Sequence, residues 1–241
     1  DDFTLTGRKR WITYGNLADI FVVVARLNDK PTAFLVPRTS DGLWIEPVED
    51  MLGFRSAELA NLTLDECKIP RESMLGRPGF GFSHVAGTAL DHGRFCIAWG
   101  CVGLAEGCIN ASMDHALERE QFGKTLSEHQ LIQQILADML VGTRAAKGLC
   151  VEAAELKRVG DPKVIMETSI AKYYASRNAA QVSRDAVQIL GGTGCSAEAH
   201  VERYFRDSKV MEIIEGSSQI QQLIIARHGL MQFRKNQFAS N

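Results

Sequence analysis

The spacing of apolar residues changes between residues 70 and 80, and this change constrains the fold more than any other feature. Before it, short apolar or alternating runs are separated by turn residues, a pattern that predicts β-strands. Evenly spaced short strands favour an antiparallel sheet or part of a barrel. Because a few strands pair poorly on their own, this segment is expected to need further partners. The expected strands lie at residues 9–13, 18–25, 32–37, 43–47 and 58–64.

After Pro78-Gly79 the apolar residues recur at helical spacing. Local signals mark some helix ends. Ser127 with Gln130 forms a candidate capping box, Asp161-Pro162 offers a cap residue with proline in the first turn, and Gly191-Gly192 stops a helix. Long helices with short connections favour an antiparallel bundle. The expected helices lie at about residues 82–120, from Ser127 onward, from Asp161 to Leu190, near residues 197–204, and from Ser217 or Ser218 onward.

Together the two halves predict an α+β fold. We expect a partial antiparallel β-domain over residues 1–75, followed by an antiparallel four-helix-bundle-like α-domain over residues 76–241. A chain of 241 residues can bury a sizeable core in either one large domain or two smaller ones.

Charge and cysteine usage exclude several functional classes. The formal net charge of -2 provides no basic field for nucleic acid or an anionic membrane. The apolar runs are too short for a membrane span to be expected. The six cysteines form no CxxC pair and have no histidine at zinc-ligand spacing, so no metal site or disulfide is expected, which suits a reducing compartment. The first residues do not resemble a signal or transit peptide, and the chain is expected to begin inside a domain.

The segment around Glu215 is the first candidate for chemistry. A carboxylate here follows an apolar stretch and precedes Gly216 and a helix start. The glycine lets the backbone approach a ligand closely, and an apolar surround raises a carboxylate pKa toward the range of a general base. A surface glutamate before an ordinary serine cap is the commoner explanation of so short a pattern. Spacing alone leaves both interpretations open.

Motifs in a fixed order resemble those of the acyl-CoA dehydrogenase family and cover essentially all of the chain. Ile214 to Ile220 resembles the family segment that carries the catalytic base. The other matching segments are Gly7-Arg8-Lys9-Arg10-Trp11-Ile12-Thr13, Leu52-Gly53-Phe54-Arg55-Ser56, Ile69-Pro70, Leu90-Asp91-His92-Gly93-Arg94, Glu118-Arg119-Glu120-Gln121-Phe122-Gly123-Lys124, Gln188-Ile189-Leu190-Gly191-Gly192-Thr193-Gly194 and Tyr204-Phe205-Arg206-Asp207.

The resemblance implies roles for individual residues. Glu215 is implied as the base, with Asp91, Arg94 and Gly216 beside the acyl thioester. Asp91 or Arg94 in a structural salt bridge, and Arg119 as a helix C-terminal cation, are the competing interpretations. Trp11 also fits a core aromatic, and Gly191-Gly192 a simple helix end. The implied FAD contacts are Trp11, Thr13, Ser217 and Gln219 within one subunit, and Arg119, Gln121, Phe122, Gln188 and Gly192 toward a neighbouring subunit's FAD.

Two comparisons with the family motifs refine this assignment. Some relatives place the base just before the helix arginine, and that position is Gly93 here, which leaves Glu215 without a rival. Tyr14 stands where relatives often have asparagine, a departure expected to affect only a turn. The family's N-terminal helical domain has no counterpart, so the chain resembles the carboxyl-terminal two-thirds.

The activity implied by the resemblance is FAD-dependent α,β-dehydrogenation of an acyl thioester, with removal of the α-proton by Glu215 and hydride transfer to flavin N5. The implied partners are acyl-CoA or an acyl-carrier-protein thioester, an electron-transfer flavoprotein, and further copies of the chain in a dimer or tetramer. A bacterial cytoplasm or the mitochondrial matrix is the implied location. An acyl-CoA oxidase, a dehydrogenase of carrier-bound acyl chains, and a non-catalytic fragment remain as alternatives.

Overall fold

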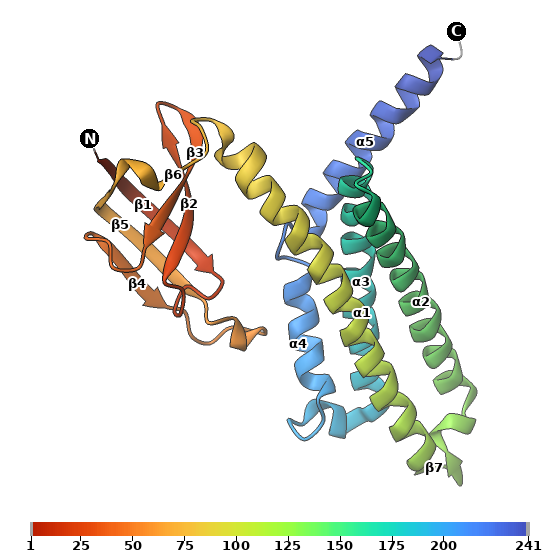
Figure 1. Cartoon of the computed structure of the whole chain (residues 1–241). Coiled ribbons are helices and arrows are strands. Elements are labelled where there is room, and N and C mark those ends of the chain that lie inside the picture. Colours follow the sequence, from red (N-terminus) through yellow and green to blue (C-terminus); the bar gives the residue numbers. More distant parts are fainter. Residues whose placement is uncertain (1, 240–241) are drawn as a thin grey trace. The chain divides into compact units, whose positions relative to one another are not determined.

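The computed structural model describes residues 2–239, and the chain separates into two compact units between Leu90 and Asp91. Unit 1 is built from strands and unit 2 from helices (Figure 1). The expected α+β fold is confirmed. The division falls inside one continuous helix, so the expected domain boundary near residue 75 stays a prediction.

Unit 1 contains two antiparallel three-stranded sheets. Alternation buries one face of each strand: Phe21 and Val23 are buried, whereas Ile20 and Val22, which alternate with them, are more than half exposed. The buried faces form one apolar cluster that includes Phe34 and residues of both sheets. The first sheet has the order β1 (Phe3–Ile12), β5 (Ala60–Ile69), β4 (Leu43–Pro47), and the second has the order β2 (Ile20–Leu27), β3 (Lys30–Pro37), β6 (Met74–Leu75).

The five expected strands are present; β4 has the expected ends, and the other four have at least one shifted end. β1 begins at Phe3 because it pairs along β5, with Phe3 opposite Ile69. Its polar, exposed residues hide this extension in the sequence. β6 was not expected, because two residues are too few to show alternation. The apolar residues left exposed on β2 are compatible with further strand partners, which stay a prediction.

Unit 2 is an antiparallel helical bundle, in which α3 packs against α2, α4 and α5 (Figure 1). Small side chains such as Ala171, Ala175 and Ala179 line α3 and let its neighbours approach. The helices are α1 (Gly87–Glu118), α2 (Gln130–Val159), α3 (Val164–Leu190), α4 (Val201–Met211) and α5 (Ser218–Ala239), and a π-helical turn at Gly81–Ala86 precedes α1.

The expected capping box at Ser127 is wrong. The box is formed by Thr125 and Glu128, and it caps the 3-10 turn Leu126–Glu128. A hairpin of β7 (Glu120–Gln121) and β8 (Lys124–Thr125) displaces the helix start, so α2 begins one turn later, at Gln130. The hairpin fits a type I′ turn, because both its central residues have positive φ.

Two other helix starts also lie later than expected. Asp161 does not cap α3; its Oδ1 accepts a hydrogen bond from the amide of Lys163 at 2.8 Å, and the helix begins at Val164. The short helix expected near residues 197–204 is α4, Val201–Met211, because a 3-10 turn at Gly191–Cys195 uses the residues before it. α3 ends at Leu190, as expected.

Among the described residues, the helical segment Gly81–Glu118 is long and apolar enough to cross a membrane by length and composition alone. In its most apolar window, 44% of the residues are buried within the protein. Core helices pass the same criterion, so this is weak evidence for a span.

Candidate active site

The loop between α4 and α5 contains two successive residues with left-handed backbone. Glu215 has φ 57° and Gly216 has φ 94°. Glycine adopts this region freely, but for a glutamate the conformation is uncommon and costs about 1–3 kcal/mol. Such strain persists only where the surroundings impose it, so the residues that contact this loop must stabilise its conformation.

Side chains from three helices hold this loop by its carbonyl oxygens. Arg94 Nε on α1 donates to the Glu215 carbonyl at 3.0 Å. Lys172 Nζ on α3 donates to the Gly216 carbonyl at 2.8 Å. Gln221 Nε2 on α5 donates to both carbonyls at 3.2 Å. The strained turn is therefore fixed within unit 2 from three directions.

The Glu215 carboxylate lies against α1 at Gly93. A Cβ atom at Gly93 would lie 2.8 Å from Glu215 Oε1, and it would also overlap Cδ and Oε2. Any other residue at this position would compete with the carboxylate for the same space. Because Gly93 has no side chain, the Glu215 carboxylate can occupy the space beside α1.

The electrostatics raise the pKa of the Glu215 carboxylate above its ordinary value. Burial raises the pKa of Glu215, while the positive charges of Arg94 and Lys172 lower it to a smaller extent. A base with a raised pKa takes up a proton more readily than an ordinary carboxylate. The site therefore combines a half-buried carboxylate of raised pKa with a loop held in place by hydrogen bonds.

The chain matches two domains of one family. Residues 79–230 match the acyl-CoA dehydrogenase C-terminal domain, and residues 1–67 match the acyl-CoA dehydrogenase middle domain. The chain belongs to the acyl-CoA dehydrogenase family. The motif resemblance is thereby confirmed.

Known acyl-CoA dehydrogenases extend beyond this chain. Short-chain specific acyl-CoA dehydrogenase, mitochondrial, of Rattus norvegicus is 41% identical over 239 residues, which cover 97% of this chain and 58% of the rat enzyme. The structure of butyryl-CoA dehydrogenase from Megasphaera elsdenii superposes with a TM-score of 0.91 at 36% identity, covering 95% of this chain and 61% of that one. A chain in a structure described as electron transferring flavoprotein of Acidaminococcus fermentans gives the same values.

Among the implied substrate contacts, Arg94 and Gly216 are in the Glu215 loop or bound to it, whereas Asp91 pairs with α2. Asp91 Oδ2 lies 3.1 Å from Lys157 Nζ, which is the structural salt bridge considered for this residue. Asp91 Oδ1 is buried without a hydrogen-bond partner among the described residues. The contact seen for Asp91 is thus structural, and a substrate role stays a prediction.

The implied FAD contacts of unit 2 lie at exposed positions, except Ser217, which is half-buried. Arg119, Gln121 and Phe122 lie at the end of α1 and on the β7-β8 hairpin, where Phe122 is 94% exposed. Gln188 and Gly192 are exposed at the end of α3. At the start of α5, Ser217 is half-buried and Gln219 is exposed. Their cofactor roles stay predictions.

The implied FAD contacts of unit 1 lie at the end of β1. Trp11 is 50% exposed, so it is not a core aromatic, and its backbone has φ 62°. Its amide donates to Asn61 Oδ1 at 3.4 Å, and Thr13 beside it is exposed. Their cofactor roles stay predictions.

Lys172 and Gln221 were missed by the motif analysis although both side chains are fully buried. A signal was present for Lys172: it is the only charged residue in the segment from Ser169 to Ala175. A lone lysine on a buried helix face demands a partner. Gln221 lies in a polar run and gave no such signal.

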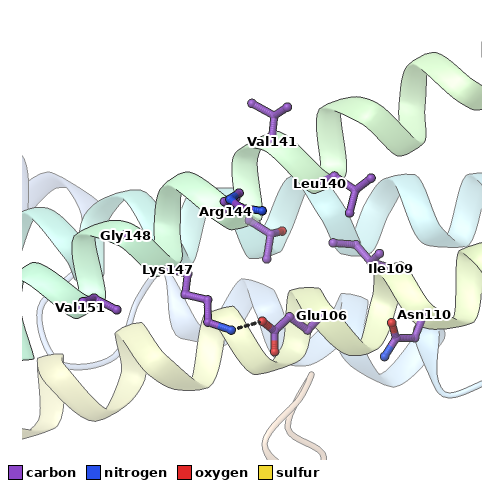
Figure 2. A pocket seen from close by; sticks show the side chains of 10 residues that line it. Glu106, Ile109, Asn110, Leu140, Val141, Arg144, Lys147, Gly148 and Val151 are labelled. Carbon is purple, nitrogen blue, oxygen red and sulfur yellow. Dashed lines mark hydrogen bonds and ion pairs between the residues drawn. The ribbon is translucent and has the colours of Figure 1, made fainter.

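A separate groove of about 940 Å³ lies between α1 and α2 (Figure 2). Its walls include Ile109, Leu140 and Val151, and an ion pair joins Lys147 Nζ to Glu106 Oε1 at 2.9 Å. Glu215 does not line it. The groove is therefore distinct from the candidate active site.

Buried Lys172 predicts an unusual dependence of stability on pH. Burial lowers its pKa from 10.5 to about 8, with Arg94 adding to the decrease. Between these pH values the unfolded chain binds more protons at this group, so its contribution to the free energy of unfolding rises with pH. Urea unfolding of the full-length gene product at pH 8 and pH 10 should show this rise as the difference between wild type and Lys172→Met.

Comparison with the variant is necessary because buried thiols act in the opposite direction. Burial raises the pKa of Cys101 and Cys108 to about 12. Their contribution to the free energy of unfolding therefore falls as the pH rises and the thiols of the unfolded chain ionise. An identical pH dependence in wild type and Lys172→Met would contradict the prediction.

Proposed function

We propose that this chain supplies the catalytic base of an FAD-dependent α,β-dehydrogenation of an acyl thioester. The observation that carries the proposal is the Glu215 carboxylate, half-buried against Gly93 in a loop that three helices hold. In this reaction Glu215 accepts the α-proton of the substrate. Membership of the acyl-CoA dehydrogenase family supports the reaction class.

Removal of the α-proton places negative charge on the thioester carbonyl, which requires hydrogen-bond donors in fixed positions. The resemblance implies the backbone N–H of Glu215 as one donor and a ribityl hydroxyl of FAD as another. The left-handed turn at Glu215 and Gly216 sets the direction of that N–H. The same strained turn therefore positions the base and a donor.

The residues implied for FAD suit that cofactor chemically. Arg119 is exposed and carries a guanidinium that pairs with two phosphate oxygens at once. Phe122 and Trp11 offer exposed aromatic faces for planar rings. When bound, FAD supplies the redox chemistry and takes up the β-hydrogen as hydride. The exposed hairpin with Arg119 and Phe122 suits contact with a neighbouring copy, which supports a homo-oligomer.

The names of relatives suggest the partners. The rat relative is named short-chain specific, and the Megasphaera elsdenii structure is of a butyryl-CoA dehydrogenase, so we propose an acyl-CoA substrate. The Acidaminococcus fermentans structure supports an electron-transfer flavoprotein as acceptor. The rat relative is mitochondrial by name, and the location of this chain stays a prediction.

Anaerobic flavin reduction tests the proposal. The full-length gene product, loaded with FAD, is mixed with short, medium and long saturated acyl-CoAs, and bleaching of the flavin absorbance is recorded. We expect bleaching with at least one acyl-CoA and formation of the matching α,β-unsaturated thioester. Reduction only by carrier-bound thioesters, or rapid reoxidation by air, would identify the alternatives instead. Bound flavin that no acyl thioester reduces would contradict the proposed reaction.

A further inference from the structure

Lys172 is a buried cation whose hydrogen bonds within the described residues all go to the loop that carries Glu215. It lies on α3 and is fully buried. Its Nζ donates to the Gly216 carbonyl at 2.8 Å and to the Glu212 carbonyl at 3.4 Å. These two carbonyls flank Glu215 on either side. One ammonium group therefore ties together both ends of the segment from Glu212 to Gly216.

Burial and the charge of Arg94 lower the pKa of Lys172 to about 8, so its surroundings as a whole disfavour a cation in this core. Arg94 repels it, and the Cys101 thiol is neutral at working pH because burial raises its pKa to about 12. Glu212 and Glu215 attract it, yet Glu212 directs its carboxylate to Lys209 at 2.7 Å. A methionine would occupy a similar volume without the cost of burying a charge. The role of the ammonium is therefore to donate hydrogen bonds to the carbonyls of the loop.

The same carbonyl of Glu212 also organises the start of α5. It accepts a hydrogen bond from the Ser218 amide at 3.0 Å, and Ser218 Oγ lies 3.5 Å from it. Lys172 thus acts at the point where the end of α4, the strained turn and the first turn of α5 meet. Movement of its ammonium would displace the backbone on both sides of Glu215.

We propose that Lys172 is a positioning residue for Glu215: its ammonium fixes the Glu212 and Gly216 carbonyls and so holds the carboxylate at Gly93. The proposal rests on the proposed function, because it assigns Lys172 to the same base. Lys172 does not touch the substrate in this account. It acts through the loop backbone, and its positive charge favours the ionised form of Glu215.

Three variants of the FAD-loaded full-length gene product test the role. Lys172→Met removes both hydrogen bonds and the charge, and Lys172→Gln keeps an N–H donor without the charge. Ser183→Ala is the matched control on α3, because it removes a buried hydroxyl that bonds to Ser208 Oγ at 2.9 Å. The readouts are hydrogen exchange of the amides of residues 212–218, the rate of flavin reduction, and its dependence on pH.

We expect Lys172→Met to reduce flavin about 100-fold more slowly, the loss associated with a misplacement of about 1 Å. The amides of residues 212–218 should exchange faster. The acid limb of the rate profile should move to higher pH, because the charge of Lys172 lowers the pKa of Glu215 while Arg94 still acts on it. Lys172→Gln should show the same shift of the limb and a smaller increase in exchange. Ser183→Ala should lose thermal stability without either change.

The outcomes separate this proposal from the proposed function. Wild-type loop exchange and an unshifted acid limb in Lys172→Met would make Lys172 a merely structural residue and overturn the proposal, even if stability falls. Should Lys172→Met fail to fold, the same readouts on Lys172→Gln decide. A normal rate in Lys172→Met beside an inactive Glu215→Gln refutes only the Lys172 role. A normal rate in Glu215→Gln refutes the proposed function and this role together.

Discussion

Alanine at position 93 is expected to slow flavin reduction by about 100-fold while leaving the protein folded. The added methyl would lie 2.8 Å from Glu215 Oε1 and would overlap the rest of the carboxylate. The overlapping atoms are the end of a flexible side chain, so the carboxylate moves and α1 stays in place. Alanine also has the higher helix propensity, by about 0.8–1 kcal/mol in a helix interior.

Gly103→Ala is the matched control for this prediction. Gly103 lies on the same helix, and a Cβ atom there has no neighbour within 4 Å among the described residues. Both variants should unfold at or above the wild-type temperature in a thermal scan, and only Gly93→Ala should show slow flavin reduction in stopped flow. Equal reduction rates for the two variants would mean that the carboxylate does not act from its place at Gly93.

The division into strands and helices was predictable because burial imposes different spacings on the two structures. Short apolar runs bounded by turn residues marked the strands, although the continuous apolar run at residues 20–24 does not show the alternation of burial found at Phe21 and Val23. Local ends were less predictable. Ser127 and Thr125 both suit a helix start, and the hairpin at Phe122-Gly123 decides between them. The sequence around Ser127 does not indicate which of the two residues forms the capping box.

The candidate site was predictable as a list of residues but not as an arrangement. The segment at Glu215 was found because it resembles a known motif. Its left-handed backbone was not foreseen, since no local rule places a glutamate at φ 57°. The turn is held by Gln221, six residues further on, and by Arg94 and Lys172, which come from helices far from it in the sequence. Tertiary contacts of this kind leave only weak signals, such as a single lysine on an apolar helix face.

Glu215→Gln is expected to have the largest effect of any single change, a loss of at least about 10³-fold in the rate of flavin reduction by an acyl-CoA. Glutamine keeps the size of the side chain and cannot take up the α-proton. It carries no charge, and burial already raises the pKa of Glu215 by disfavouring the ionised carboxylate. Stability should therefore be unchanged or slightly higher. Substrate binding, measured by the change that it causes in the flavin absorbance spectrum, should persist.

Glu106→Gln provides the control, since it makes the same chemical change on α1 in a half-exposed ion pair with Lys147. It should reduce flavin at the wild-type rate. A Glu215→Gln protein that binds acyl-CoA and still reduces its flavin normally would refute the assignment of the base. Comparison with Gly93→Ala then isolates the chemistry, because that variant keeps a carboxylate and displaces it. Glu215→Gly removes the side chain and leaves the space beside Gly93 open. If Glu215 is the base, an added small carboxylate such as acetate should restore part of the reduction rate in Glu215→Gly. It should not do so in Glu215→Gln, where the glutamine side chain fills that space.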